Sequence, residues 1–157
     1  IQMTFEKVWG AGANTAVRWY NAGARSLDDL RARDDLDERQ RAGLRHFADM
    51  QRRIPRAEVD AGIQKIREAA SKLPHSAAVR FLEAMGSYRR GKATSGDIDV
   101  LICINADTGA TPGTFLADLH SALRSGLFLT DDMTPPSPHR AGSDSRASWM
   151  GFCHVEI

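Results

Sequence analysis

The sequence predicts an α+β protein in which an all-helical module is followed by a small α/β domain. In the first third, apolar residues recur at helical spacing between glycine turns. Further along, β-branched apolar runs alternate with helical patterns, which is typical of strands packed on helices. Residues 1–56 carry 11 basic and 8 acidic residues, whereas residues 57–157 carry 10 and 12. This division suits a first domain that meets phosphates and a second that holds metal.

Two short helices joined by a glycine turn are expected at the start of the chain. Helical patterns over residues 3–8 and 13–22 flank Trp9-Gly10-Ala11-Gly12, and Gly23 should stop the second helix. Glycines let a backbone approach phosphate closely, and the first amides of a following helix point at the anion, as in a helix-hairpin-helix. An ordinary helical hairpin fits the pattern equally well. Trp19 and Tyr20 are assigned to the core rather than to base stacking.

The rest of the helical module follows from capping signals. Ser26 with Asp29 predicts a capping box for a helix ending near residue 33, and Asp37 is expected to cap a longer helix. An apolar stripe on that longer helix comprises Leu44, Phe47, Met50 and Ile54. The arginines on its other face are interpreted mainly as solvated. The first domain is therefore predicted over residues 1–53.

Residues 54–157 are predicted as a second domain. Pro55 suits the start of a helix because its φ is fixed and its missing N–H is not needed there. The following elements are a helix to about residue 74, strands over 77–85 and 97–102, a helix over 114–124, and strands beginning at 127 and 149. The segment 134–148, rich in Pro, Ser and Gly, is expected to be a mobile hairpin loop. Cys103 and Cys153 lack zinc-ligand spacing and are expected to be buried thiols.

The most informative stretch runs from residue 85 to residue 102. It contains Asp97-Ile98-Asp99 before a β-branched segment, and strand alternation would place both carboxylates on one face. Such a pair repels unless a cation lies between the acids, and Mg²⁺ is usually held by one or two carboxylates plus substrate phosphates. Backbone amides, a hydroxyl and guanidinium groups for a phosphate cradle lie upstream in Gly86-Ser87 and Arg89-Arg90-Gly91. A solvated strand entrance is the alternative, and the concentration of these features disfavours it.

The segment Gly86-Ser87-Tyr88-Arg89-Arg90-Gly91-Lys92, followed by Gly96-Asp97-Ile98-Asp99-Val100-Leu101-Ile102, resembles the palm motif of the family X DNA polymerases. The run from Val8 to Ala16, with the glycine turn, resembles the fingers of the same family. Members that carry Gly-Gly and His-Asp at the positions of Gly86-Ser87 and Gly96-Asp97 fit less well. The resemblance covers essentially the whole chain and implies a helix-hairpin-helix module followed by a partial, polymerase beta-like nucleotidyltransferase palm.

The resemblance assigns the palm residues to a two-metal nucleotidyl transfer. Asp97 and Asp99 become the catalytic ligands of Mg²⁺, with Mn²⁺ as a possible substitute. The triphosphate contacts are assigned to Gly86, Ser87, Arg90, Ser95, Gly96 and, near the hinge, Arg53. Arg89 and Lys92 are left to solvent or DNA. The family's third carboxylate lies in an Arg-Arg-x-Asp context that this sequence lacks, and the setting of Glu156 does not match it.

In the helical module, the resemblance assigns only backbone groups. Carbonyl oxygens of Glu6, Val8 and Ala11 would bind a monovalent cation, Na⁺ or K⁺. Amides that contact DNA phosphates are assigned to Gly10, Gly12 and Thr15. Contacts of this kind position a protein on DNA without reading the base sequence.

Taken together, the sequence predicts a nuclear, monomeric DNA-directed DNA polymerase that fills gaps in repair, in base excision repair and end joining. Its partners would be gapped or primer–template DNA and dNTP, and no segment could span a membrane. Because the third carboxylate is missing, the chain is expected to be a fragment that is inactive alone. The alternatives are another nucleotidyltransferase with the same palm, which has no need of a helix-hairpin-helix, and a non-catalytic DNA-binding module, which the paired aspartates argue against.

Overall fold

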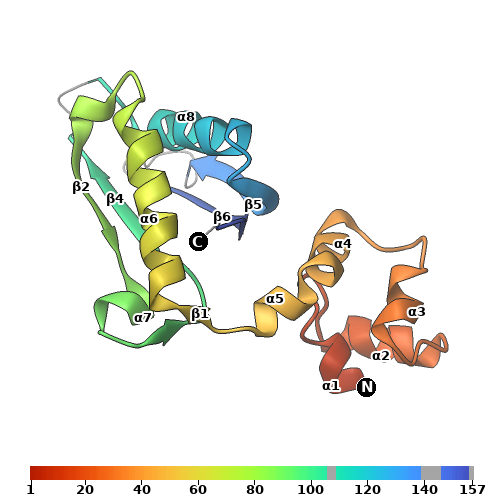
Figure 1. The fold of residues 1–157 in the computed structure, drawn as a ribbon. Helices are drawn as coiled ribbons and strands as arrows, with labels where there is room; N and C mark the ends of the chain where they lie inside the picture. The colour runs from red at the N-terminus through yellow and green to blue at the C-terminus, as the bar shows by residue number, and fades with distance from the viewer. Residues whose placement is uncertain (106–108, 139–145, 156–157) are drawn as a thin grey trace. The chain divides into compact units, whose positions relative to one another are not determined.

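A computed structural model describes residues 1–105, 109–138 and 146–155 of the chain. The chain divides into two compact units, Ile1–Arg52 and Arg53–Ile157, which are coloured from red to orange and from yellow to blue in Figure 1. Each unit buries a hydrophobic cluster of its own. The first unit is helical and the second combines helices with small sheets, which confirms the α+β fold class.

The first unit consists of short helices connected by turns. In chain order these are α1 (Gln2–Phe5), α2 (Ala13–Asn21), α3 (Leu27–Arg31), α4 (Glu38–Arg45) and α5 (Phe47–Gln51). Both predicted caps are present: Ser26 Oγ accepts the Asp29 amide at 3.1 Å, and Asp37 Oδ1 accepts the Gln40 amide at 2.8 Å. These local bonds satisfy amides that a helix start leaves without intrahelical partners.

Two helix predictions in the first unit were wrong in extent. The first helix ends at Phe5 instead of Val8. The expected long helix after Asp37 breaks at His46 into α4 and α5, and Ile54 lies in a strand of the second unit. Part of the reason is steric, because the residue before a proline is disfavoured in helical conformation, and Ile54 precedes Pro55.

The core of the first unit forms around Trp19, which is fully buried and meets Phe5 edge-on at 6.2 Å between ring centroids. The buried cluster comprises Phe5, Val8, Ala16, Trp19, Ala24, Leu30, Leu36 and Leu44. The core assignment of Trp19 is therefore confirmed. Tyr20 is only half-buried, and the Arg25 guanidinium lies 4.0 Å from the centroid of its ring, so the same assignment was wrong for Tyr20.

The second unit contains three antiparallel strand pairs and two long helices within the described residues. Its elements are β1 (Ile54–Pro55), α6 (Arg56–Ser71), the 3₁₀ turn η1 (Ser76–Ala78), β2 (Val79–Ala84), α7 (Gly86–Arg89), β3 (Thr94–Ser95), β4 (Val100–Ile104), α8 (Pro112–Ser125), β5 (Leu129–Pro138) and β6 (Ala147–Cys153). The pairs are β1–β3, β2–β4 and β5–β6. Pro55 is the N-cap of α6, as its position in the sequence predicted.

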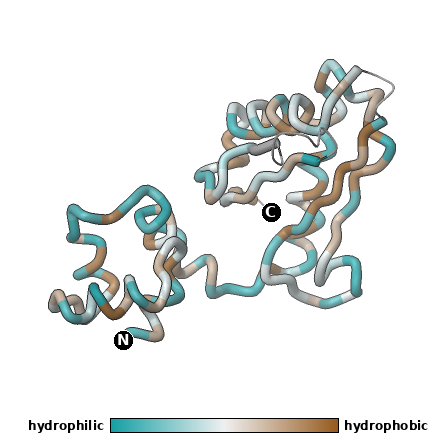
Figure 2. Tube along the Cα trace, turned by 180° about the vertical axis from the view of Figure 1, so that it is seen from behind, coloured by the Kyte–Doolittle hydropathy of each residue, from teal (hydrophilic) through white to brown (hydrophobic). Residues whose placement is uncertain are grey.

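The core of the second unit lies where α6 packs on β2 and α8, and where α8 packs on β5 and β6. Leu82 and Ala84 of β2 point into it, whereas Phe81 and Glu83, on either side of Leu82, are exposed. This alternation is the period-two pattern of a strand with one buried face. Figure 2 shows the hydrophobic run that β4 adds beside β2.

The prediction of a loop over residues 134–148 was wrong at both ends, because β5 continues to Pro138 and β6 begins at Ala147. Pairing shifts register between Asp132 and Thr134 and again between Thr134 and Ser137. Such irregularities let a strand accommodate prolines, which cannot donate to the ladder. Residues 139–145 and Glu156, which also carried expectations, lie outside the described residues.

Two expectations from composition can be compared with the structure. Both cysteines are free thiols, but Cys103 is half-buried and Cys153 is exposed, so the prediction that both are buried was wrong. No helix in the described part of the chain has the length and apolarity needed to cross a membrane.

Candidate functional site

Asp97 and Asp99 lie in the segment that leads into β4, not on the strand where they were predicted. Residues 96 and 97 form a bend, and paired strand begins at Val100, opposite Ala84. The Asp99 carbonyl still accepts the Met85 amide at 2.8 Å, which extends the ladder by one residue. Both aspartates are exposed while Ile98 packs against the core. The segment thus presents two acids to solvent from an anchored backbone.

The surroundings of Asp99 make ionisation of its carboxyl less favourable than in a free aspartate. Partial burial raises the pKa of the Asp99 carboxyl above its usual value, and the negative charge of Asp97 raises it further, against the opposing effect of Arg90. Neither carboxylate forms a hydrogen bond or ion pair with the described residues. Two neighbouring acids without such partners are the arrangement that a bound cation would stabilise.

Gly86 brings backbone directly against this acid pair. Its φ is +53°, in the left-handed region, and a Cβ placed on it would lie 1.9 Å from Oδ2 of Asp99. Glycine is favoured here, because any side chain would strain the backbone and force the Asp99 carboxylate to move. The predicted Gly-Ser turn is the first turn of the short helix α7, which follows directly from β2 through Met85.

The remaining predicted phosphate contacts lie near α7, in the case of Arg90, and near β3, in the case of Arg53. Arg90 Nη2 lies 3.5 Å from Ser87 Oγ. Arg53 donates from Nε to Thr94 Oγ1 at 3.2 Å and from Nη2 to the Thr94 carbonyl at 2.7 Å. These bonds bring Arg53 next to Gly96, where a Cβ would lie 3.3 Å from its Nη1.

Ser95 differs from the other predicted contacts in its burial. Its side chain is only 2% exposed, and its backbone pairs with Ile54 between β3 and β1. The neighbouring Gly96 is exposed. Of these two residues, Gly96 is therefore the one that the folded chain presents to a ligand.

The predicted DNA and cation groups of the helical unit lie between Glu6, which caps the end of α1, and Thr15 in the first turn of α2. Gly10 has φ +81°, the Ala11 amide donates to the Val8 carbonyl at 2.9 Å, and Gln40 Nε2 donates to the Gly10 carbonyl at 3.3 Å. Gly12 is the N-cap of α2, whose start has no side-chain cap. No atom lies within 4 Å of a Cβ placed on Gly12. The first amides of α2, including that of Thr15, therefore lie at an open helix end with no side-chain cap.

Sequence reasoning missed two residues that hold this turn. Gly43 of α4 packs so tightly that a Cβ would lie 2.7 Å from the Trp9 nitrogen and 2.8 Å from the Trp9 carbonyl oxygen. Gln40 contacts the Gly10 carbonyl from the same helix. A glycine inside a helical pattern is the signal that could have found Gly43, because such a glycine costs helix stability and often marks a close approach.

Sequence reasoning also missed a set of side chains beside α7. Arg56 and Asp60, on the first turns of α6, both contact Tyr88. Their spacing of four residues places them on one face of the helix, which is a weak signal because charged pairs at this spacing are common.

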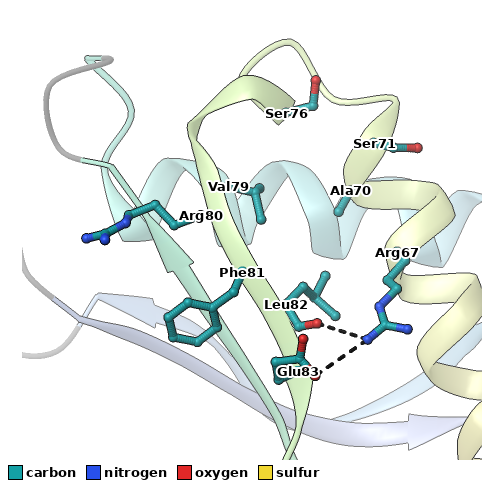
Figure 3. Close-up of a pocket in the computed structure, with 9 residues that line it drawn as sticks. All are labelled: Arg67, Ala70, Ser71, Ser76, Val79, Arg80, Phe81, Leu82 and Glu83. Atoms are coloured by element: carbon teal, nitrogen blue, oxygen red, sulfur yellow. Dashed lines mark hydrogen bonds and ion pairs between the residues drawn. The ribbon is translucent and has the colours of Figure 1, made fainter.

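A shallow hollow between α6 and β2 contains none of the predicted site residues (Figure 3). Arg67 spans it by donating to the Leu82 carbonyl at 3.2 Å and pairing with Glu83 at 3.7 Å. The hollow is lined by Arg67, Ala70, Ser71, Ser76, Val79, Arg80, Phe81, Leu82 and Glu83.

Within residues 1–105, 109–138 and 146–155, no group of three or more His, Cys, Asp or Glu could hold a metal ion.

Comparisons with known proteins cover both units. Residues 53–157 match the DNA polymerase beta palm family, and residues 3–51 match the fingers domain of DNA polymerase lambda. DNA polymerase lambda of Rattus norvegicus is 39% identical over 151 residues, which cover 96% of this chain and 25% of that protein. The Arabidopsis thaliana DNA polymerase lambda is 36% identical over 151 residues, 95% of this chain and 27% of that protein.

A third relative is similar over a shorter stretch. The DNA-directed DNA/RNA polymerase mu of Homo sapiens is 40% identical over 99 residues, which cover 62% of this chain and 19% of that protein. The polymerase lambda matches extend over more of the chain, in agreement with the Gly-Ser and Gly-Asp pairs in the motif. The chain spans about a quarter of the length of the polymerase lambda relatives.

Proposed function

This chain belongs to the family X DNA polymerases, and on that basis we propose that it supplies the fingers and the nucleotide-binding palm of a gap-filling DNA repair polymerase. The reaction is transfer of a nucleotide from dNTP to a primer 3′-hydroxyl, with pyrophosphate as the leaving group. The observation that carries the proposal is the packing of Gly86 against the Asp99 carboxylate, which joins an acid pair to a phosphate-type loop. The match to a polymerase fingers domain disfavours other nucleotidyltransferases with the same palm.

Asp97 and Asp99 would hold the divalent ions, Mg²⁺ or in its place Mn²⁺. The donor set fits, because both ligands are carboxylate oxygens and the Asp97 charge disfavours ionisation of Asp99 when no cation is bound. Two protein carboxylates leave coordination positions for phosphate oxygens of the nucleotide, which is how Mg²⁺ is commonly bound. When bound, the ions neutralise charge at the transferred phosphoryl group and favour loss of the 3′-hydroxyl proton.

The triphosphate would be bound by the residues around α7 and β3. Gly86 offers an amide next to the acid pair, Ser87 a hydroxyl and Arg90 a guanidinium. Of Ser95 and Gly96, only Gly96 is exposed to a ligand, because Ser95 is buried. Arg53 uses Nε and Nη2 on Thr94, so its Nη1 beside Gly96 stays available for a phosphate oxygen. Guanidinium–phosphate bonds are charge-assisted and roughly twice as strong as neutral hydrogen bonds.

The helical unit would bind the backbone of gapped or primer–template DNA. The amides of Gly10, Gly12 and Thr15 would contact phosphate, supported by the positive φ of Gly10 and the uncapped start of α2. A monovalent cation, Na⁺ or K⁺, would be bound by the carbonyls of Glu6, Val8 and Ala11. The Val8 carbonyl already accepts one amide and would use its second lone pair. We place the protein in the nucleus as a monomer.

A one-nucleotide gap-filling assay on the complete protein tests the proposal, with Asp99→Ala as the variant. Loss of a divalent-ion ligand should lower kcat/KM by about a thousand-fold, because metal binding contributes several kcal/mol and each tenfold is about 1.4 kcal/mol. Affinity for gapped DNA should be unchanged. Asp118→Ala, an exposed position on α8, is the matched control. Gap filling that survives Asp99→Ala at the control's rate would contradict the metal assignment.

A further inference from the structure

Three side chains outside the ligand set connect the start of α6 to α7. The Arg56 guanidinium lies 3.7 Å from the centroid of the Tyr88 ring, and its Nη1 donates to the Tyr88 carbonyl at 3.0 Å and to the Lys92 carbonyl at 3.5 Å. The Tyr88 hydroxyl donates to the Asp60 carboxylate. Arg56, Asp60 and Tyr88 are called the α6–α7 clamp below.

Backbone bonds at the same place show what the clamp encloses. The Arg56 amide donates to the Ala93 carbonyl at 3.1 Å, and Ile54–Pro55 pairs with Thr94–Ser95. Residues 86–92 are therefore fixed at one end by β2 and at the other by the β1–β3 pair. Between these ends, the clamp contacts the segment at residue 88 and again at residue 92.

The segment needs such support because its own structure is weak. Helix α7 has four residues, and a single helical turn is not stable by itself in water. Tyr88 lies directly after Ser87 and two residues before Arg90. Fixing the ring and carbonyl of Tyr88 therefore constrains the backbone that carries the Ser87 hydroxyl and the Arg90 guanidinium. The hydrogen bond to the Asp60 carboxylate also raises the pKa of the Tyr88 hydroxyl, which is already protonated at neutral pH and is the donor in this bond.

We propose that Arg56, Asp60 and Tyr88 are positioning residues that hold the phosphate-binding segment, residues 86–92, in the shape that binds the nucleotide triphosphate. None of the three is assigned to touch the ligand. The inference rests on the proposed function, because only if residues 86–92 bind a nucleotide can the clamp affect nucleotide binding. It predicts that loss of the clamp weakens binding of substrate and transition state alike, and therefore raises KM for dNTP more than it lowers kcat.

Kinetics of the complete protein test this with variants that remove defined parts of the clamp. Arg56→Met removes the ring contact and both carbonyl bonds, and should raise KM for dNTP by about tenfold with kcat changed less than about threefold. Tyr88→Phe keeps the ring beneath Arg56 and loses only the Asp60 bond, so a rise of about threefold is expected. Arg56→Lys keeps the charge but not the planar fork, and should restore KM only in part.

Arg67→Met is the matched control. Arg67 lies on the same helix and also donates to a backbone carbonyl, that of Leu82, but it contacts β2 on the hollow shown in Figure 3 instead of α7. Its KM for dNTP should stay within about twofold of the unchanged protein. If Arg56→Met and Arg67→Met raise KM equally, or if both lower kcat without changing KM, the clamp only stabilises the fold and the positioning role is wrong.

Hydrogen–deuterium exchange gives a second measurement that needs no nucleotide. Amides of residues 86–92 should exchange at least about fivefold faster in Arg56→Met and at the original rate in Arg67→Met. Unchanged exchange in Arg56→Met would overturn the inference even if its KM for dNTP is raised. Failure of the proposed function would give a different result. In that case Asp99→Ala would retain full gap filling, while the exchange result at residues 86–92 would still hold.

Discussion

In the helical unit the groups assigned to ligands belong to the backbone, whereas in the palm unit they belong mainly to side chains. Gly10 and Gly12 offer amides from a turn that α4 holds through Gly43 and Gln40. Asp99, Arg90 and the other palm residues offer charge. Function in the first unit should therefore be sensitive to changes that displace backbone, and function in the second to changes of side-chain chemistry. The comparison also identifies one palm position, Gly86, that should behave like a residue of the first unit.

Gly86→Ala should have the largest effect. A Cβ would lie 1.9 Å from Asp99 Oδ2 at a backbone φ of +53°, so either the carboxylate or α7 must move. Displacement of a catalytic group by about 1 Å can cost about a hundred-fold, and we expect kcat/KM for gap filling to fall at least that far. Affinity for gapped DNA should stay unchanged, as measured by fluorescence anisotropy.

Gly91→Ala is a useful comparison for that variant. Gly91 also has a positive φ, +75°, but no atom lies within 4 Å of a Cβ placed on it. It should show the cost of the strained backbone alone, about 1 kcal/mol of stability, without the collision. If both variants lose activity equally, contact with the Asp99 carboxylate is not what requires glycine at position 86.

Gly43→Ala should have the next largest effect and act on the other unit. Its Cβ would meet backbone atoms of Trp9 at 2.7 to 2.8 Å, and overpacking of this kind costs about 1–3 kcal/mol. Hydrogen exchange should show destabilisation confined to residues 1–52, and affinity for gapped DNA should fall as the glycine turn is displaced. Destabilisation of the palm by the same amount would contradict the view that each unit has its own core.

Local signals and distant contacts explain which parts of these two units the sequence predicted. The caps at Ser26 and Asp37 join residues three apart, so the spacing alone predicted them, and both are present. Arg53 reaches Thr94 across 41 positions of the chain, and Arg56 reaches Tyr88 across 32. Periodicity does not reveal such pairs: the family resemblance placed Arg53 near the triphosphate without naming Thr94, and both contacts were missed. The break at His46 was also missed, because neither Gly nor Pro marks it.

Asp132→Asn should destabilise the palm by about 1–3 kcal/mol at pH 7, because it disrupts bonds to a half-buried carboxylate. Trp149 Nε1 donates to Asp132 Oδ1 at 2.7 Å, His120 Nε2 lies 2.8 Å from the same oxygen, and Arg124 Nη1 donates to Oδ2 at 3.0 Å. Burial raises the pKa of Asp132. The hydrogen bonds from His120 and Trp149 and the charge of Arg124 outweigh that effect, with His120 contributing most, and hold the pKa below its usual value. Urea unfolding measures the loss, with Asp118→Asn as an exposed control.

The pH dependence of that loss follows from the direction of the pKa change. A carboxyl with a lowered pKa in the folded state stabilises the protein above its unfolded value, 3.8, and loses that contribution as pH falls through the folded value. The difference between the unchanged protein and Asp132→Asn should therefore be largest at neutral pH and shrink below about pH 4. A difference that stays constant down to pH 2 would show that the Asp132 charge is not responsible.

The smallest expected effect comes from comparing two helix ends. Helix α2 is followed, after its C-cap Ala22, by Gly23 at φ +97°, and the Ala24 amide donates to the Trp19 carbonyl at 3.1 Å. Helix α8 ends with the same bond, from Phe128 to Leu123 at 3.0 Å, but its left-handed residue is Leu127 at φ +58°, and the glycine at 126 has an ordinary φ of −80°. Glycine is the residue that this position favours.

Leu127→Gly should therefore stabilise the palm by about 0.5–1 kcal/mol. The left-handed conformation costs a residue with a Cβ about 1–2 kcal/mol, and the greater freedom of glycine in the unfolded chain offsets part of the gain from removing that cost. Little burial is lost, since Leu127 is 82% exposed. Thermal unfolding measures the change, and Gly23→Ala in the first unit should show the opposite sign. If Leu127→Gly destabilises the palm instead, the exposed leucine makes a contact in solution that outweighs its backbone strain, and the two helix ends are not equivalent.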